Sequence, residues 1–205
     1  MIGIDQFFET GCRFFRALKD NQRGVIFMEF ALAAPVVALL FIAGFETARY
    51  VLAHQKVSHI ASSVADLVAQ SDAGITEGTI NDLMLSSQFI ASPFPFAENG
   101  SVIISAVAGT TSDGNTIMWQ RCGGGDLEAK SSLGSPGDEN VKLASDIELG
   151  PNAMAIVSEA LYVYRPLFFN QFIGQQTLRH ESLFRPRLGL LSTVHDDGAP
   201  SSICT

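Results

Sequence analysis

The sequence predicts an α+β protein with a long N-terminal helix, a second helix and a small antiparallel β-sheet. Three observations predict this class. Residues 25–45 form an apolar run, residues 50–67 repeat apolar side chains at helical spacing, and four later segments have the length and composition of strands. The chain of 205 residues is long enough for one domain with a buried core.

The apolar run at residues 25–45 has the length of a transmembrane helix. Its 21 residues would rise about 31 Å as a helix, and the hydrocarbon core of a bilayer is about 30 Å thick. Glu29 is its one charged residue, and Pro35 in its interior predicts a kink. Arg16, Lys19 and Arg23 precede the run, which predicts that the N-terminus lies in the cytoplasm.

Three other interpretations of this run compete. A secretory signal peptide has a shorter apolar core, of roughly 7–15 residues, with a small-residue cleavage site after it. A helix in a soluble core would be shorter and would avoid an unpaired acid. An uncleaved signal anchor would have the same length, with Glu29 as a coincidence. A carboxylate in lipid costs roughly 2.5–3.5 kcal/mol on insertion scales, so an acid retained there favours a functional explanation.

The helical pattern continues beyond the apolar run. Apolar side chains recur at spacings of three and four up to about Gln70, and Gly74 provides a stop. One face of this extension is expected to pack on a globular domain. The members of the stripe are Tyr50, Ala53, Val57, Ile60, Val64 and Leu67.

The remaining elements follow in order along the chain. A second amphipathic helix is expected over residues 76–90 and is ended by the two prolines of residues 92–95. Strands are expected at 101–110 and 116–122, joined by the hairpin signal Ser112-Asp113-Gly114-Asn115, and again at 153–164 and 176–185. Residues 123–140 are rich in Gly, Ser, Asp and Glu and are predicted to form a long surface loop.

Charge and composition exclude some functions. The net charge is −8, and residues 25–205 carry nine basic against eighteen acidic side chains, so no nucleic-acid partner is expected. No metal ligands occur at a recognisable spacing: His54 and His59 are five apart, and His180 and His195 look isolated. We recognise no phosphate loop and no nucleophile motif, so neither a cofactor nor an enzymatic activity is expected.

Three cysteines raise a question of pairing. Cys12 lies in the basic leader, where the thiol is expected to stay reduced. Cys122 and Cys204 both follow the apolar run and would form a disulfide in an oxidising compartment. Two free buried thiols are the alternative.

Several separated motifs resemble one family. The segment Gly24-Val-Ile-Phe-Met-Glu29-Phe-Ala-Leu, followed by Pro35, is similar to the N-terminus of TadE-like proteins, the minor pseudopilins of the tight-adherence (Tad/Flp) pilus. Four further segments are similar: residues 46–50, which directly follow the apolar run, Trp119-Gln-Arg-Cys122, residues 159–167 and Arg185-Pro-Arg187.

The resemblance implies a processing step and a set of partners. A prepilin peptidase would cut between Gly24 and Val25, and Glu29 would pair with the new α-amine of a neighbouring subunit. The partners would be that peptidase, the other Tad pseudopilins and the inner-membrane assembly platform. Residues 1–24 would then be a cytoplasmic leader, 25–45 a single transmembrane helix and 46–205 a periplasmic domain.

A second hypothesis needs no processing. The chain could be a single-pass scaffold or sensor with a periplasmic domain, whose leader stays attached. The leader phenylalanines would then bind a partner or the inner leaflet of the membrane. These residues are Phe7, Phe8, Phe14 and Phe15.

Overall fold

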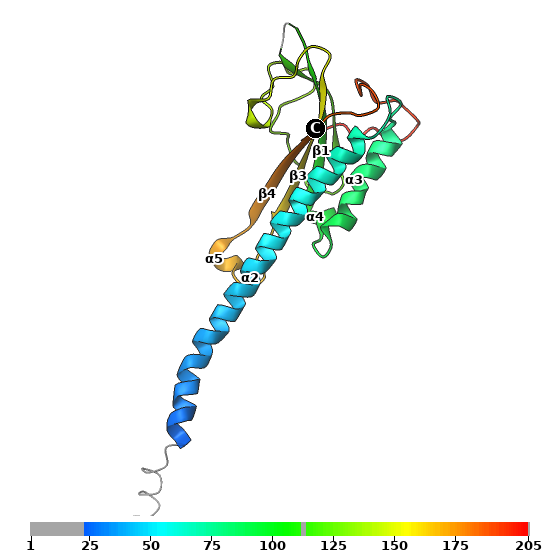
Figure 1. Ribbon diagram of the computed structural model, residues 1–205. Helices are drawn as coiled ribbons and strands as arrows, with labels where there is room; N and C mark the ends of the chain where they lie inside the picture. The colour runs from blue at the N-terminus through cyan, green and yellow to red at the C-terminus, as the bar shows by residue number, and fades with distance from the viewer. Residues whose placement is uncertain (1–22, 112–113, 205) are drawn as a thin grey trace, which may run out of the picture. The chain divides into compact units, whose positions relative to one another are not determined.

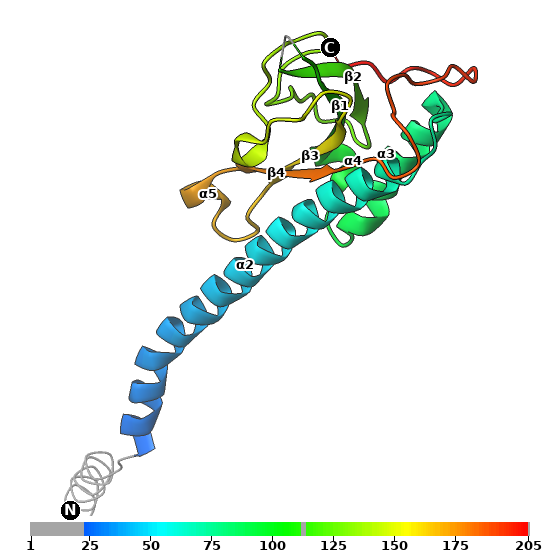
Figure 2. The same cartoon turned by 45° about the horizontal axis from the view of Figure 1, so that its top comes forward.

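The computed structural model describes residues 23–111 and 114–204. Residues 1–22 of the leader, with Cys12 and the four leader phenylalanines, lie outside the described residues, as do Ser112 and Asp113 of the hairpin. The chain divides into two compact units, Met1–Thr47 and Ala48–Thr205. The predicted α+β class is confirmed, with α-helices and one four-stranded antiparallel sheet (Figures 1 and 2).

Helix α2 (Arg23–Ala69) is continuous and includes Pro35 in its interior. Its part within the second unit has one buried face, as the apolar stripe predicts. Tyr50 and Leu67, at the two ends of the predicted stripe, are partly exposed, and Val68 is buried instead of Leu67. The step of four from Val64 to Val68 keeps the buried face aligned, because an α-helix has 3.6 residues per turn.

Helix α3 (Glu77–Ala91) is bounded by the signals that the sequence contains. The Thr76 side chain accepts a hydrogen bond from the Thr79 amide at 3.2 Å, which is the usual way to satisfy a free donor at a helix N-terminus. The helix ends at Ala91, immediately before Ser92 and Pro93. The prediction of residues 76–90 is therefore correct to within one residue at each end.

The sheet contains β1 (Gly100–Gly109), β2 (Asn115–Gly123), β3 (Met154–Tyr164) and β4 (Gln176–Phe184) in the order β2-β1-β3-β4. All neighbouring strands are antiparallel. Three short helical turns complete the fold: α4 (Phe96–Asn99), η1 (Ala144–Asp146) and α5 (Asn170–Ile173). The sequence pattern did not indicate these turns, because each is only three or four residues long.

The main hydrophobic core lies between α2, α3 and one face of the sheet. On this face β3 places Met154, Ile156, Ala160, Tyr162 and Tyr164, the alternating set that the sequence predicts. Strands β1 and β3 are central in the sheet and are buried on both faces.

A second, smaller core covers the opposite face of the sheet and includes residues of the connection between β2 and β3. The predicted surface loop, residues 123–140, is mostly exposed or half-buried, and Leu133 is its member that packs on this core. Leu133, Val141, Leu143 and Leu149 pack on Ala155 and neighbouring strand residues. The same connection also binds the outer edge of β2, where the Gly137 amide donates to the Ile117 carbonyl at 2.8 Å. Its apolar side chains are too far apart in sequence to form a period, so no pattern indicates their burial.

Candidate processing and assembly site

The first part of α2 has apolar side chains exposed all around the helix. These exposed residues include Phe27, Met28, Leu32, Leu40 and Phe41. None of the most apolar window of this helix is buried. A helix in a soluble core is mostly covered by its own chain, and this helix is not. One long apolar N-terminal helix fits a single-pass membrane anchor.

Gly24 lies at the start of this helix and has open space around it. A Cβ built on Gly24 would meet no atom within 4 Å, and the residue does not have a positive φ. Neither packing nor backbone conformation therefore requires glycine at this position.

Glu29 lies one helical turn after Val25, and its side chain is exposed. Side chains in a helix point toward its N-terminus, so the Glu29 carboxylate is directed toward the Val25 end. The first turn of α2 contains no acid, so Glu29 lies beyond the free amide donors and partial positive charge of the helix N-terminus, which act within about one turn.

The comparison with protein families matches this part of the chain. Residues 24–66 match the sequence profile of the family described as "TadE-like protein", which is less than half of the chain. The chain contains a TadE-like segment. The match begins at Gly24, includes Glu29 and continues into the second unit, and it confirms the predicted resemblance. No curated protein and no solved structure matches the chain.

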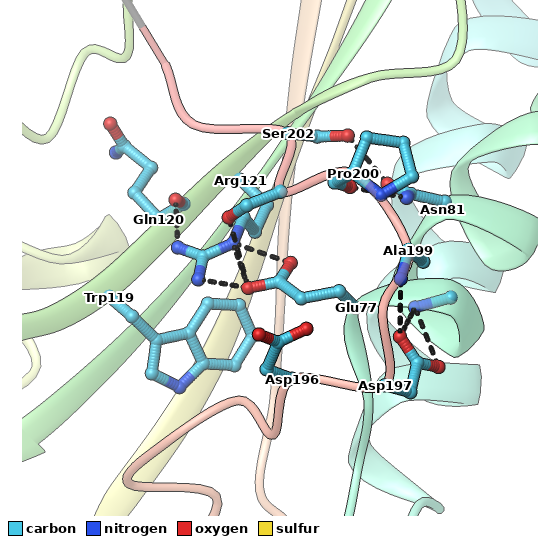
Figure 3. Close-up of polar contacts among 12 residues, drawn as sticks. Glu77, Asn81, Trp119, Gln120, Arg121, Asp196, Asp197, Ala199, Pro200 and Ser202 are labelled. Carbon is cyan, nitrogen blue, oxygen red and sulfur yellow. Dashed lines mark hydrogen bonds and ion pairs between the residues drawn. The ribbon is translucent and has the colours of Figure 1, made fainter.

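In the second unit, the structure brings the C-terminal segment onto α3 and β2. Cys122 and Cys204 are joined by a disulfide with an S–S distance of 1.96 Å. The Cys122 amide also donates to the Ser202 carbonyl at 2.8 Å. Asn81 of α3 donates from Nδ2 to the Pro200 carbonyl at 2.9 Å (Figure 3).

Glu77 is the polar centre of this attachment (Figure 3). Its carboxylate accepts from Arg121 Nε at 2.9 Å and Nη2 at 2.5 Å, and from Ser201 Oγ at 3.0 Å. The hydrogen bonds from Arg121 hold the pKa of Glu77 below its usual value, although burial acts in the opposite direction. The pair thus joins α3, β2 and the C-terminal segment at one buried point.

Asp197 provides a second contact at the same helix end. Its carboxylate accepts from the Gly78 amide at 3.3 Å, within the first turn of α3. A Cβ on Gly78 would lie 2.7 Å from Asp197 Oδ2, so glycine allows this close approach. The pKa of Asp197 is lowered, mainly by a hydrogen bond from the Thr76 side chain.

Glu159 of β3 forms the corresponding centre on the other face of the sheet. Its buried carboxylate accepts from Ser132 N at 2.9 Å, Ser132 Oγ at 2.5 Å and Arg179 Nη1 at 2.6 Å, and also from Ser131 Oγ. This cluster attaches the long β2–β3 connection to the middle of the sheet. Sequence reasoning placed Glu159 in a family-like motif but did not identify these partners.

The prediction that His180 is isolated is wrong. His180 Nε2 lies 2.7 Å from His54 Nδ1, which joins β4 to α2. Burial, and then the charge of His54, lower the pKa of His180. Over residues 23–111 and 114–204, no group of three or more His, Cys, Asp or Glu side chains could hold a metal ion.

Proposed function

We propose that the chain is a non-enzymatic, pseudopilin-like subunit needed for assembly of a Tad/Flp pilus. A prepilin peptidase cuts it between Gly24 and Val25, and residues 25–45 then anchor the mature subunit in the inner membrane. Residues 46–205 form its periplasmic domain. Its partners are the peptidase, other Tad pseudopilins and the inner-membrane assembly platform.

One observation carries this proposal: the TadE-like match begins at Gly24 and covers the exposed apolar run of residues 25–45, in which Glu29 is the single acid. The apolar side chains of this run are exposed in the described part of the chain, which supports a location in lipid. Gly24 has no structural role in the fold, so its identity supports recognition by a protease that needs a residue without a side chain.

The role of Glu29 follows from the energy of a charge in lipid. An acid in the hydrocarbon costs roughly 2.5–3.5 kcal/mol on insertion scales. Cleavage before Val25 creates an α-amine, and pairing of this amine with the Glu29 carboxylate of a neighbouring subunit offsets that cost. Subunits whose charges are paired in this way are favoured over isolated ones, which gives the acid an assembly function.

The disulfide supports the periplasmic location of the second unit. Disulfides persist in the bacterial periplasm and are rare in the cytosol. The Cys122–Cys204 bond lies entirely within the second unit. The basic residues before the apolar helix support the same orientation, with the leader in the cytoplasm.

Intact-mass measurement of the membrane form tests the processing step. Co-expression with a prepilin peptidase should give a mature chain that begins at Val25. Gly24→Val should keep the Met1 terminus, because a branched side chain next to the cleaved bond blocks the site without disturbing the fold. Gly44→Val is the matched control, since a Cβ there also meets nothing within 4 Å, and this variant should be cleaved normally. An intact Met1 terminus in cells with functional pili would instead support the uncleaved scaffold or sensor.

Glu29→Gln tests the assembly role separately. The variant removes the charge and keeps the shape, so membrane insertion and cleavage should be retained while piliation is lost. Glu29→Asp keeps the charge on a shorter side chain and should assemble better than Glu29→Gln. Normal pili on cells that make only Glu29→Gln would contradict the amine pairing.

A further inference from the structure

The connection between β3 and β4 exposes a group of large apolar side chains. It spans residues 165–175 and includes the short helix α5. Phe172 is 85% exposed, and Leu167, Phe168 and Ile173 are each more than half exposed. Such a dense exposed apolar group in one short loop marks an interaction surface.

The position of this loop in the second unit follows from the contacts between α2 and the sheet. Two contacts lie on β4 itself: His54 with His180 (2.7 Å) and Ser62 with Ser182 (3.4 Å). Before them, Tyr50 contacts Tyr164 (5.4 Å between ring centroids), the β3 residue that pairs with Gln176 at the start of β4. After them, Asp66 pairs with Arg187, just beyond β4 (2.6 Å). Strand β4 therefore runs in the same direction as α2. The loop precedes Gln176, so it lies at the end of the unit where α2 enters from Ala48 (Figures 1 and 2).

The chain itself ties the start of the second unit to the apolar run. Tyr50 is five residues after Phe45, the last residue of the apolar run. Even a fully extended chain of five residues reaches only about 18 Å. The polar headgroup layer adds about 5–7 Å on each side of the hydrocarbon core, so the loop is within reach of the lipid interface.

The composition of the loop suits a lipid interface. Residues 165–175 contain one base, Arg165, and no acid, in a chain with a net charge of −8. Arg165 is exposed and can face lipid phosphates, while phenylalanine and leucine side chains enter the boundary between headgroups and acyl chains. The absence of acids in this loop removes a source of repulsion from anionic lipid.

We propose that residues 165–175 form a second membrane contact, in which the apolar side chains of the loop lie in the interface of the outer leaflet of the inner membrane. The partner is the lipid surface itself. The proposal rests on the membrane anchor and not on the pilus function. With two contacts, the anchor helix and the loop, the second unit would be held in a restricted orientation on the bilayer before it joins other subunits.

Quenching by brominated lipids tests the contact in the full-length chain. The chain has one tryptophan, Trp119, which is buried, so an added tryptophan can be read as a difference from the unsubstituted protein. Phe172→Trp reports on the loop. Leu188→Trp is the matched control, because Leu188 is 67% exposed but lies beside Asp72, beyond the other end of α2.

Both variants are reconstituted in vesicles of phosphatidylcholine and phosphatidylglycerol, with and without bromine on the acyl chains. Emission from Phe172→Trp should fall about twofold in brominated vesicles, as expected for a side chain at the acyl boundary, and emission from Leu188→Trp should not change. Acrylamide in the buffer should quench Leu188→Trp more strongly than Phe172→Trp. The substitution of an exposed side chain leaves the core intact, and the Cys122–Cys204 bond can be checked by mass.

Two results would overturn the proposal. One is equal exposure of both added tryptophans to acrylamide with no quenching by brominated lipid. The other is protection of Phe172→Trp only after another pilus protein is added, which would make the loop a protein-binding surface. Flotation of the protein with the vesicles reports on the anchor alone. A chain that floats but is not quenched therefore fails the loop proposal and leaves the anchor intact.

Discussion

The buried ion pair of Glu77 and Arg121 allows a quantitative prediction for Arg121→Ala. Their side chains are 7% and 15% exposed, so both charges are largely removed from water. Removal of one partner from a buried pair costs about 3–5 kcal/mol, because the other charge stays buried without compensation. Two contributions remain for Glu77: the hydrogen bond from Ser201 at 3.0 Å, and the favourable position in the first turn of α3, worth about 0.3–1 kcal/mol. The variant should therefore lose about 3 kcal/mol in the free energy of unfolding.

Urea unfolding of the full-length chain in detergent micelles measures this loss. Trp119 is buried and its Nε1 donates to the Leu191 carbonyl at 2.7 Å, so its fluorescence follows unfolding of the second unit. Arg187→Ala is the matched control. Arg187 also forms an ion pair, with Asp66 at 2.6 Å, but these side chains are 58% and 34% exposed. Such a surface pair contributes about 0–1 kcal/mol, so the control should change stability little.

The pH dependence gives an independent check of the same pair. The hydrogen bonds from Arg121 lower the pKa of Glu77 from its usual value of 4.5, so the ionised form is favoured in the folded state. The stabilisation is then complete above the unfolded pKa and is lost as the pH falls through the folded pKa. The difference between wild type and Arg121→Ala should shrink as the pH is lowered from 6 toward 3. A constant difference over this range, or a loss below about 1 kcal/mol at pH 7, would refute the reasoning.

Two further predictions concern the disulfide and the histidine pair. Cys204→Ser removes the disulfide, which closes a loop with a sequence separation of 82. The chain-entropy model gives a loss of up to about 4.5 kcal/mol in the free energy of unfolding, which the same urea titration measures. Equal stability of the variant and wild type would contradict the disulfide. Burial and the charge of His54 lower the pKa of His180, so NMR titration should give a value below 6.5. The stabilisation from neutral His180 is present above pH 6.5 and is lost as the pH falls through the pKa of His180 in the folded protein. A measured pKa above 6.5 would contradict this account.

The helices and strands were predictable because each has a strong local signal. The buried stripe of α2, the prolines that end α3 and the alternation along β3 all depend on residues close in sequence. The apolar run of residues 25–45 likewise needs only composition and length to indicate an anchor. Gly24 and Glu29 were identified for the same reason, since their spacing is visible within one short segment.

The partners of the buried polar groups were not predictable from the sequence. His180 lies 126 positions from His54, and Arg121 lies 44 positions from Glu77. Each pair depends on the packing of α2 or α3 against a particular strand, and no pattern within either segment indicates the other. The β2–β3 connection is a similar case, because its few apolar side chains gain partners only when the sheet is complete.

By itself, the sequence determined the apolar anchor with its single acid, the order of helices and strands, and the resemblance to TadE-like proteins. Those properties come from short-range periodicity, length and composition, which are present before folding. Only the tertiary structure decided which charges are buried together, which face of the sheet the long connection covers, and where the exposed loop at 165–175 lies. Those properties depend on contacts between distant segments, and such contacts form only when the strands have paired and the helices have packed on them.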